Sequence, residues 1–242
     1  MELKVLKSAE INEEIADEIV DLINKNPHTI LGLATGSSPV GVYKELIKKY
    51  QEGLVSFKNV KTYNLDEYIG LTKDNDQSYY YFMMHNLFDH IDINKTNIHV
   101  PDGINYEDSI ENYEKNIAKD GGIDFQILGI GSNGHIAFNE PGTPFDSHVH
   151  KVELKESTRL DNSRFFASID DVPTSAITMG LESILNSKKI VLIATGEHKA
   201  LAIKHLFEGN EDINWPMTIL NRHPNVTIYC DEAAASLIIG RK

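Results

Sequence analysis

Apolar residues recur along the chain at two different spacings. In residues 9–24, Ile11, Ile15 and Ile19 stand four positions apart, which places them on one face of a helix. Helices are also expected over residues 39–50, 78–89 and 105–118, after Gly180, and in a segment that ends at Leu206. Continuous apolar runs predict buried strands at residues 28–36, 59–68, 97–101, 123–131, 189–196 and 225–230.

This alternation predicts an α/β fold with a mostly parallel central sheet that helices cover on both faces. Ser38 can cap the second helix, with Pro39 at its first position. Residues 1–242 are expected to form a single domain, because no internal repeat or linker divides them. Residues 131–157 interrupt the alternation with an irregular stretch, and residues 144–166 have the length and composition of a lid.

Charge and composition narrow the classes of partner. The net charge of −13 argues against a nucleic-acid surface, which needs a basic face to displace counterions. No run approaches the roughly 18 apolar residues of a membrane helix, and the first residues lack the apolar stretch of a signal peptide. The single cysteine, Cys230, is expected to be a buried thiol in a reducing compartment. We therefore expect a cytoplasmic protein that binds neither nucleic acid nor membrane.

Residues 129–134, GIGSNG, have the glycine spacing of a dinucleotide-binding loop. Such a site needs the third glycine to open a helix whose N-terminus binds the pyrophosphate. Pro141 and Pro144 follow instead and exclude a helix of normal length. We therefore expect no nicotinamide or flavin, and we expect the glycines to turn the chain beside His135 and Glu140.

Four loops follow the carboxyl ends of predicted parallel strands, at residues 35–38, 66–68, 131–140 and 196–199. In open α/β sheets, ligands bind at this edge, so the loops are expected to face one crevice. Gly36, Ser37 and Ser38 in the first loop suit a phosphate through backbone N–H groups, hydroxyls and a helix dipole. Ordinary helix capping by Ser38 explains the same residues equally well.

Cationic side chains for such a phosphate are available in Arg159, Arg164 and Lys199. Guanidinium binds phosphate through two parallel hydrogen bonds, whereas surface salt bridges are the alternative role. His148 and His150 have the spacing of two metal ligands, but no further convincing ligand accompanies them, so we expect no metal site.

Candidate acid–base groups stand in two of the loops. Asp66 and Glu67 are adjacent, and neighbouring strand residues point to opposite faces, so one is expected to be a base and the other structural. His135 and Glu140 stand five residues apart on an irregular loop, where a carboxylate can orient an imidazole for proton transfer.

Six segments together resemble the glucosamine-6-phosphate deaminases of the glucosamine/galactosamine-6-phosphate isomerase family. In chain order they are LATGSSPVGVYKEL, NLDEYIGL, SYYYFM, GIGSNGHIAFNEPG, TRLDNSRFF and GEHKAL, and the likeness runs from about residue 3 to residue 238. The related 6-phosphogluconolactonases have other residues after the GH pair. The resemblance implies a Rossmann-like three-layer α/β/α sandwich.

The resemblance also implies a reaction: D-glucosamine 6-phosphate and water give D-fructose 6-phosphate and ammonia, in amino-sugar catabolism. Because this is an internal redox reaction, no nicotinamide, pyridoxal phosphate or metal is required. The family's base matches Asp66, its ring-opening residue matches His135, and the carboxylate paired with it matches Glu140. Its phosphate-binding positions match Gly36, Ser37, Ser38, Arg164 and Lys199.

Asn133 departs from the family pattern, because many members have Asp at this position. Asn can still orient His135, but Glu140 must then supply the negative charge alone. Where allosteric members carry basic effector contacts, this chain has His150 and Val152. An unregulated monomer or small homo-oligomer is therefore expected. A lactonase, an isomerase without deamination, and a sugar-phosphate sensor without turnover are the alternatives.

Overall fold

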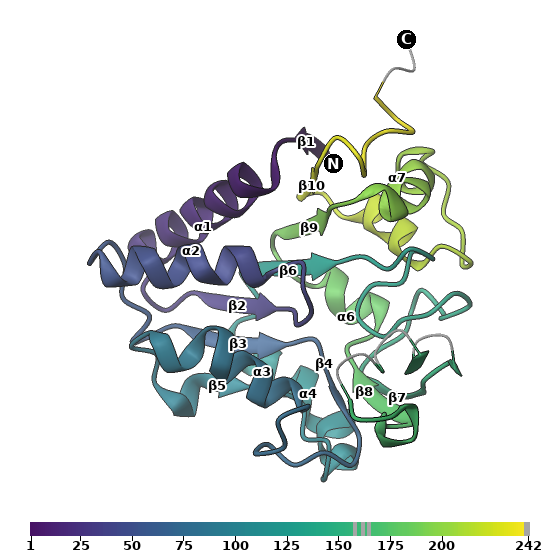
Figure 1. The fold of residues 1–242 in the computed structure, drawn as a ribbon. Helices are drawn as coiled ribbons and strands as arrows, with labels where there is room; N and C mark the ends of the chain where they lie inside the picture. The colour runs from purple at the N-terminus through teal and green to yellow at the C-terminus, as the bar shows by residue number, and fades with distance from the viewer. Residues whose placement is uncertain (157–158, 161–162, 164–165, 240–242) are drawn as a thin grey trace.

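The computed structural model describes residues 1–156, 159–160, 163 and 166–239 (Figure 1). Within these residues, seven strands form a central sheet in the order β1-β10-β9-β6-β2-β3-β5, and every neighbouring pair is parallel. The strands are β1 (Glu2–Val5), β2 (Ile30–Leu33), β3 (Lys61–Asn64), β5 (Ile98–His99), β6 (Phe125–Gly129), β9 (Ile190–Ala194) and β10 (Val226–Cys230). The predicted parallel sheet is confirmed.

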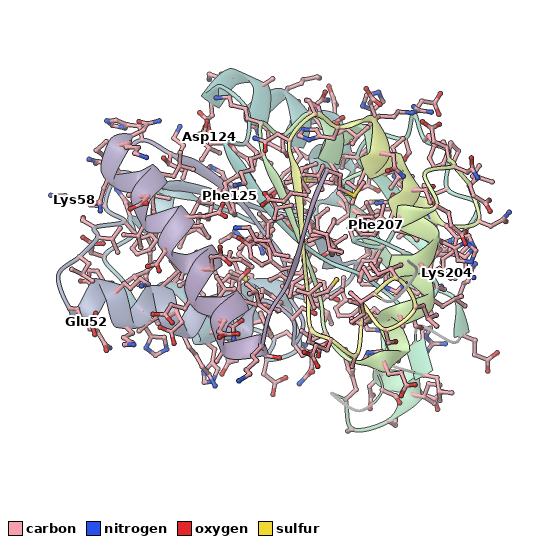
Figure 2. All side chains as sticks on the ribbon, turned by 90° about the horizontal axis from the view of Figure 1, so that it is seen from above. Glu52, Lys58, Asp124, Phe125, Lys204 and Phe207 are labelled. Carbon is pink, nitrogen blue, oxygen red and sulfur yellow. The ribbon has the colours of Figure 1, made fainter. Side chains whose placement is uncertain are left out.

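Helices cover both faces of this sheet. One face packs against α1 (Ser8–Lys25), α2 (Val40–Gln51) and α3 (Tyr79–Asn86), and the other against α4 (Tyr106–Asp120), α6 (Leu181–Leu185) and α7 (Ala200–Phe207). Short 3-10 helices span Phe88–His90, Lys95–Asn97, Ile169–Asp171, Glu197–Lys199 and Pro216–Arg222. Seen from above, Glu52 after α2 and Lys204 of α7 lie on opposite sides of the sheet (Figure 2). The three-layer α/β/α arrangement is confirmed.

The apolar core is divided by the sheet into two clusters, because successive strand residues point to opposite faces. In β9, Leu192 belongs to the cluster with α7, whereas Val191 and Ile193 belong to the cluster with α1. All five residues of β9 are buried. This burial on both faces explains why the central strands read as continuous apolar runs in the sequence.

A second, antiparallel sheet of three strands lies beyond the ends of β2 and β3 (Figure 1). Its order is β4 (Asp66–Tyr68), β8 (Ser175–Thr178) and β7 (His150–Glu153). The prediction of one strand over residues 59–68 is therefore wrong: the strand ends at Asn64, and the chain turns into a different sheet. Strands β1, β7 and β8 were not predicted, because each is short and β1 and β7 carry charged residues on an exposed side.

Two compositional expectations can be compared with the structure. None of the helices in the described residues has both the length and the apolar character needed to span a bilayer. Cys230 is fully buried, as predicted, and burial together with the charge on Asp231 raises the pKa of its thiol to about 12.

Gly32 of β2 lies against Gln126 of the neighbouring β6, and both are buried. A Cβ atom on Gly32 would come within 2.0 Å of Gln126 Oε1. We expect Gly32→Ala to lower the free energy of unfolding by about 1–3 kcal/mol through overpacking. In urea denaturation, the double variant with Gln126→Ala should lose less stability than the two single losses combined, because the clash disappears. Simple additivity would contradict this account.

Candidate active site

A cleft opens where β2 and β6 end. From these two adjacent strands the sheet continues to β3 on one side and to β9 on the other, so their ends form a topological switch point. The cleft has a volume of about 820 Å³. It is lined by residues of all four predicted loops: Thr35, Gly36, Ser37, Ser38, Asp66, Tyr68, Gly131, Ser132, His135, His198 and Lys199. The expectation that these loops share one crevice is confirmed.

The loop after β2 borders the cleft with Gly36, Ser37 and Ser38. Gly36 has a φ of +87°, a left-handed conformation that favours glycine. Helix α2 begins at Val40, its N-cap is Pro39, and no side chain caps it. The prediction that Ser38 caps this helix is therefore wrong: Pro39 takes the cap position. The Ser38 hydroxyl instead lies beside β6, where a Cβ on Gly129 would be 3.6 Å from it.

The loop after β9 brings Lys199 to the same cleft. Its start is fixed by Asp231, whose two carboxylate oxygens accept hydrogen bonds from the Gly196 N–H at 3.0 and 2.9 Å. Gly196 has a φ of +91°. Asp231 also accepts a hydrogen bond from the Ala234 N–H at 2.8 Å, which ties the loop to the C-terminal turn. The position of Lys199 thus depends on a residue far from it in sequence.

Arg159 and Arg164 were both candidates for binding the phosphate. Arg159 donates its hydrogen bonds to the carbonyls of Ile169 and Val172, at 2.9 to 3.3 Å. It therefore has a structural role within the segment after β7. Arg164 lies outside the described residues.

Asp66 and Glu67 point to different surroundings, as the strand alternation predicts. Asp66 lines the cleft and is 7% exposed. The Glu67 carboxylate accepts hydrogen bonds from the N–H groups of Tyr68, Tyr79 and Tyr80 at 2.8, 2.9 and 3.0 Å. Two of these donors are the first residues of α3, so Glu67 satisfies the start of that helix. Glu67 is the structural member of the pair.

Burial dominates the acid–base properties of both carboxyl groups. Burial, together with a smaller contribution from the negative charge of Glu67, raises the pKa of Asp66 to about 8. Burial likewise raises the pKa of Glu67 to about 7, against the lowering effect of its backbone hydrogen bonds.

His135 and Glu140 are joined through Asn133. The Asn133 Nδ2 donates to Glu140 Oε2 at 2.9 Å, and its Oδ1 lies 2.7 Å from His135 Nδ1. The direct distance from His135 Nδ1 to Glu140 Oε1 is 3.9 Å, which is too long for a hydrogen bond. The carboxylate is buried, whereas a third of the imidazole, 33%, is exposed to the cleft. Asn133 is therefore the residue that orients His135.

This network assigns the tautomer of His135. Because Asn133 Oδ1 also accepts from the His135 backbone N–H at 3.2 Å, the amide is held with its oxygen toward the ring. The Nδ1 atom of neutral His135 must therefore carry the proton, and Nε2 keeps its lone pair. A neutral imidazole in this tautomer can accept a proton at Nε2 and later return it.

Aromatic side chains form a wall of the cleft that the sequence analysis did not identify. Tyr68 packs against Tyr79 at 4.8 Å, and against Phe138 and Phe166 at 5.8 Å between ring centroids. All four residues line the cleft. Their motifs, DEY, SYYYFM, AFNEP and SRFF, are visible in the sequence, but they come from four separate segments that only the fold brings together.

His148 and His150 each contact another group of the protein. His148 Nδ1 lies 3.3 Å from Glu114, and His150 Nδ1 donates to the carbonyl of His148 at 2.7 Å. Nowhere in the described ranges do three or more His, Cys, Asp or Glu side chains gather as metal ligands would.

All residues that line the cleft lie in a region of the chain that matches a known protein family. Residues 5–229 match the family of glucosamine-6-phosphate isomerases/6-phosphogluconolactonase. A glucosamine-6-phosphate deaminase from Thermoanaerobacter pseudethanolicus is 52% identical over 231 residues, covering 95% of this chain and 91% of that protein. A solved monomeric glucosamine-6-phosphate deaminase is 43% identical with a TM-score of 0.95, covering 98% of this chain and 100% of that one. A 6-phosphogluconolactonase from Thermotoga maritima, 20% identical with a TM-score of 0.74 and covering 95% and 97% of the chains, shares the fold.

The Asp66 carboxyl is expected to titrate near pH 8 in carbon-13 NMR of the free protein. Glu67→Gln removes the neighbouring charge and should lower the midpoint by roughly one pH unit. Asp76→Asn is the matched control, because Asp76 lines the same cleft but does not raise the Asp66 pKa. An unchanged midpoint in Glu67→Gln would show that burial alone sets it.

Asn133→Asp is expected to stabilise the protonated imidazole of His135, because it puts a carboxylate where an amide now lies 2.7 Å from Nδ1. The midpoint of the His135 imidazole in NMR titration should rise by about one pH unit or more. The chain has 10 histidines, so the spectrum of His135→Gln is needed to assign the resonance. A midpoint that stays in place would mean that Asn133 does not control this ring.

Proposed function

The chain belongs to the glucosamine-6-phosphate isomerase/6-phosphogluconolactonase family, and on that premise we propose that it is a glucosamine-6-phosphate deaminase. Its reaction converts D-glucosamine 6-phosphate and water to D-fructose 6-phosphate and ammonia. The observation that carries the proposal is the cleft itself, which is lined by both a buried carboxyl group, Asp66, and an imidazole, His135. This pair suits proton transfers on a sugar, and lactone hydrolysis has no use for a base beside C2.

Ring opening is the first step, and we assign it to His135. Nε2 accepts the proton of the C1 hydroxyl while the bond from C1 to the ring oxygen breaks. The same nitrogen then returns the proton to the ring oxygen, which leaves an open-chain aldehyde. Asn133 keeps the other ring nitrogen protonated, and buried Glu140, bonded to Asn133, favours the transient imidazolium.

Proton transfer between carbons is the second step, and we assign it to Asp66. The carboxylate removes the proton from C2 of the aldehyde while the C1 oxygen takes a proton from the substrate's ammonium group, which gives an enediol-type intermediate with an amino group at C2. Returning that proton to C1 makes a C2 imine with a hydroxymethyl group at C1. Water adds to C2 and ammonia leaves, which gives the ketone. Oxidation at C2 balances reduction at C1, so no outside electron carrier takes part.

The elevated Asp66 pKa has two consequences for this step. A base of pKa about 8 is far stronger than an ordinary carboxylate, which helps it remove a proton from carbon. Only the ionised form is active, however, so kcat/KM should fall as the pH drops below about 8. A bound phosphate with its cationic partners changes the field in the cleft, and kcat reports that state separately.

The phosphate group is proposed to bind at the other end of the cleft. Backbone N–H groups at Gly36, together with the hydroxyls of Ser37 and Ser38, lie ahead of α2. Lys199 reaches the same cavity from the loop after β9. We also propose Arg164 for the phosphate, because it matches a phosphate-binding position in the family that the sequence resembles. Anchoring there leaves C1 and C2 for Asp66 and His135.

Assembly and organisation are also proposed. We infer a single domain over residues 1–242, with a lid near 144–166, and a cytoplasmic monomer or small homo-oligomer. The monomeric deaminase of known structure, at 43% identity, supports the small assembly. We also propose an enzyme without allosteric activation, because Val152 packs against the cluster of Tyr68 and Phe138 where a basic effector contact would otherwise stand.

Purified protein with glucosamine 6-phosphate is expected to release ammonia and fructose 6-phosphate in equal amounts, with chelator present and no cofactor added. Asp66→Asn should lower kcat by about 10²–10⁴-fold while substrate still binds, because the amide cannot accept the C2 proton. Ammonia by enzymatic assay and sugar phosphate by NMR measure both products.

Leu201→Ala is the matched control, since Leu201 is 47% exposed on α7 and does not line the cleft. A folded wild-type protein that binds the sugar phosphate without releasing ammonia would overturn the deaminase and favour a sensor. Fructose-type product without ammonia would indicate an isomerase instead.

A further inference from the structure

The catalytic loop, residues 134–142, contains His135 and Glu140 but has almost no regular structure of its own. A single isolated bridge, between Ile136 and Asn139, is its only β pairing in the described residues. The middle of the loop is bonded to the end of β8 and the residue after it. Phe138 N–H donates to Thr178 Oγ1 at 3.2 Å, and Asn139 Nδ2 donates to the carbonyl of Met179, which follows β8, at 2.8 Å. Its two ends, where the acid–base residues lie, need another support.

A turn at residues 212–218 supplies that support. The Met217 N–H donates to the Gly134 carbonyl at 3.0 Å, and the Gly142 N–H donates to the Ile213 carbonyl at 2.8 Å. The same turn is therefore bonded to the residue before His135 and to the residue two positions after Glu140. Both ends of the catalytic loop are held by one element.

This 212–218 turn is rigid by itself. The Trp215 N–H donates to the Asp212 carbonyl at 2.8 Å, and the Thr218 hydroxyl donates to the Trp215 carbonyl at 2.7 Å. The Asp212 N–H in turn donates to the Thr218 oxygen at 2.9 Å. Thr218 is 1% exposed, so these bonds are shielded from water.

Side-chain packing fixes the distance between turn and loop. Gly134 has a φ of +82°, and a Cβ there would lie 2.5 Å from Met217 Sδ and 2.7 Å from Trp215 Cε3. The indole thus packs directly against the backbone that carries His135. On its other side, it stacks on His205 of α7, with 4.1 Å between ring centroids and 22° between planes.

We propose that Trp215 is a positioning residue for the acid–base network, which it holds in register by packing between α7 and Gly134. The inference rests on the proposed function. Asn133 links His135 to Glu140 through hydrogen bonds of 2.7 and 2.9 Å. A small displacement of either end of the loop breaks these bonds. Ser37 and Ser38 belong to the loop after β2, so the part of the proposed phosphate site that they form does not depend on this contact.

The test compares Trp215→Ala and Trp215→Phe with wild type in glucosamine 6-phosphate turnover. Misplacement by about 1 Å can cost on the order of 10²-fold in rate, so Trp215→Ala should lower kcat at least tenfold with KM within about twofold. Trp215→Phe keeps an aromatic face for His205 and should recover most of kcat. Ile213→Ala is the matched control in the same turn, because its side chain is 43% exposed and its bonded carbonyl remains.

An unchanged kcat in Trp215→Ala would overturn the proposal, and so would a KM that rises as much as kcat falls. If Trp215→Ala does not fold, Trp215→Leu decides the matter, because it removes the aromatic stack on His205 while keeping apolar bulk, and wild-type kcat in Trp215→Leu defeats the proposal. The His135 imidazole resonance, which needs no turnover, should shift in Trp215→Ala and not in Ile213→Ala. This readout judges the positioning role even if wild type releases no ammonia, an outcome that would defeat the proposed function alone.

Discussion

The central sheet is parallel and covered on both faces, so a ligand is expected at the ends of its strands. Parallel strands bring all their carboxyl ends to one edge, and the loops that leave them are free of the packing constraints inside the layers. At the switch point between β2 and β6, this geometry gathers residues 35–38, 66–68, 131–140 and 196–199 around one cleft. The chemistry of the site follows from what each loop can hold in place there.

The short step from β3 to β4 has the largest electrostatic consequence. The chain leaves the central sheet after Asn64 and enters the small sheet at Asp66, which buries two adjacent carboxyl groups. Glu67 is compensated by three backbone N–H groups, two of them at the start of α3. Asp66 is not compensated in this way, and its raised pKa is the energetic consequence. A carboxyl group whose anionic form is destabilised by burial is a stronger base than an exposed carboxyl group, which suits the proposed proton transfer.

The polar side chains of the His135 loop differ from Asp66, because they are hydrogen-bonded to one another. Asn133 uses both ends of its amide, one toward the ring and one toward Glu140, and so sets the tautomer without adding charge. An irregular loop cannot hold hydrogen bonds of this length by its own backbone. Support from β8 in the middle and from the 212–218 turn at the ends makes the network a tertiary structure feature.

The sequence by itself determined the parallel sheet, its helices and the four loops, because strands buried on both faces must be continuously apolar and helices on a core must repeat about every 3.6 residues. Its motifs also indicated Asp66, His135 and Glu140 as candidate site residues. Tertiary structure alone decided that Ser38 is no cap, that Glu67 rather than Asp66 serves α3, and that Asn133 stands between His135 and Glu140. It also decided the short strands β7 and β8 and the packing of Trp215 on Gly134. Local patterns record burial, whereas hydrogen-bond partners, desolvation and contacts between distant segments exist only once the chain has folded.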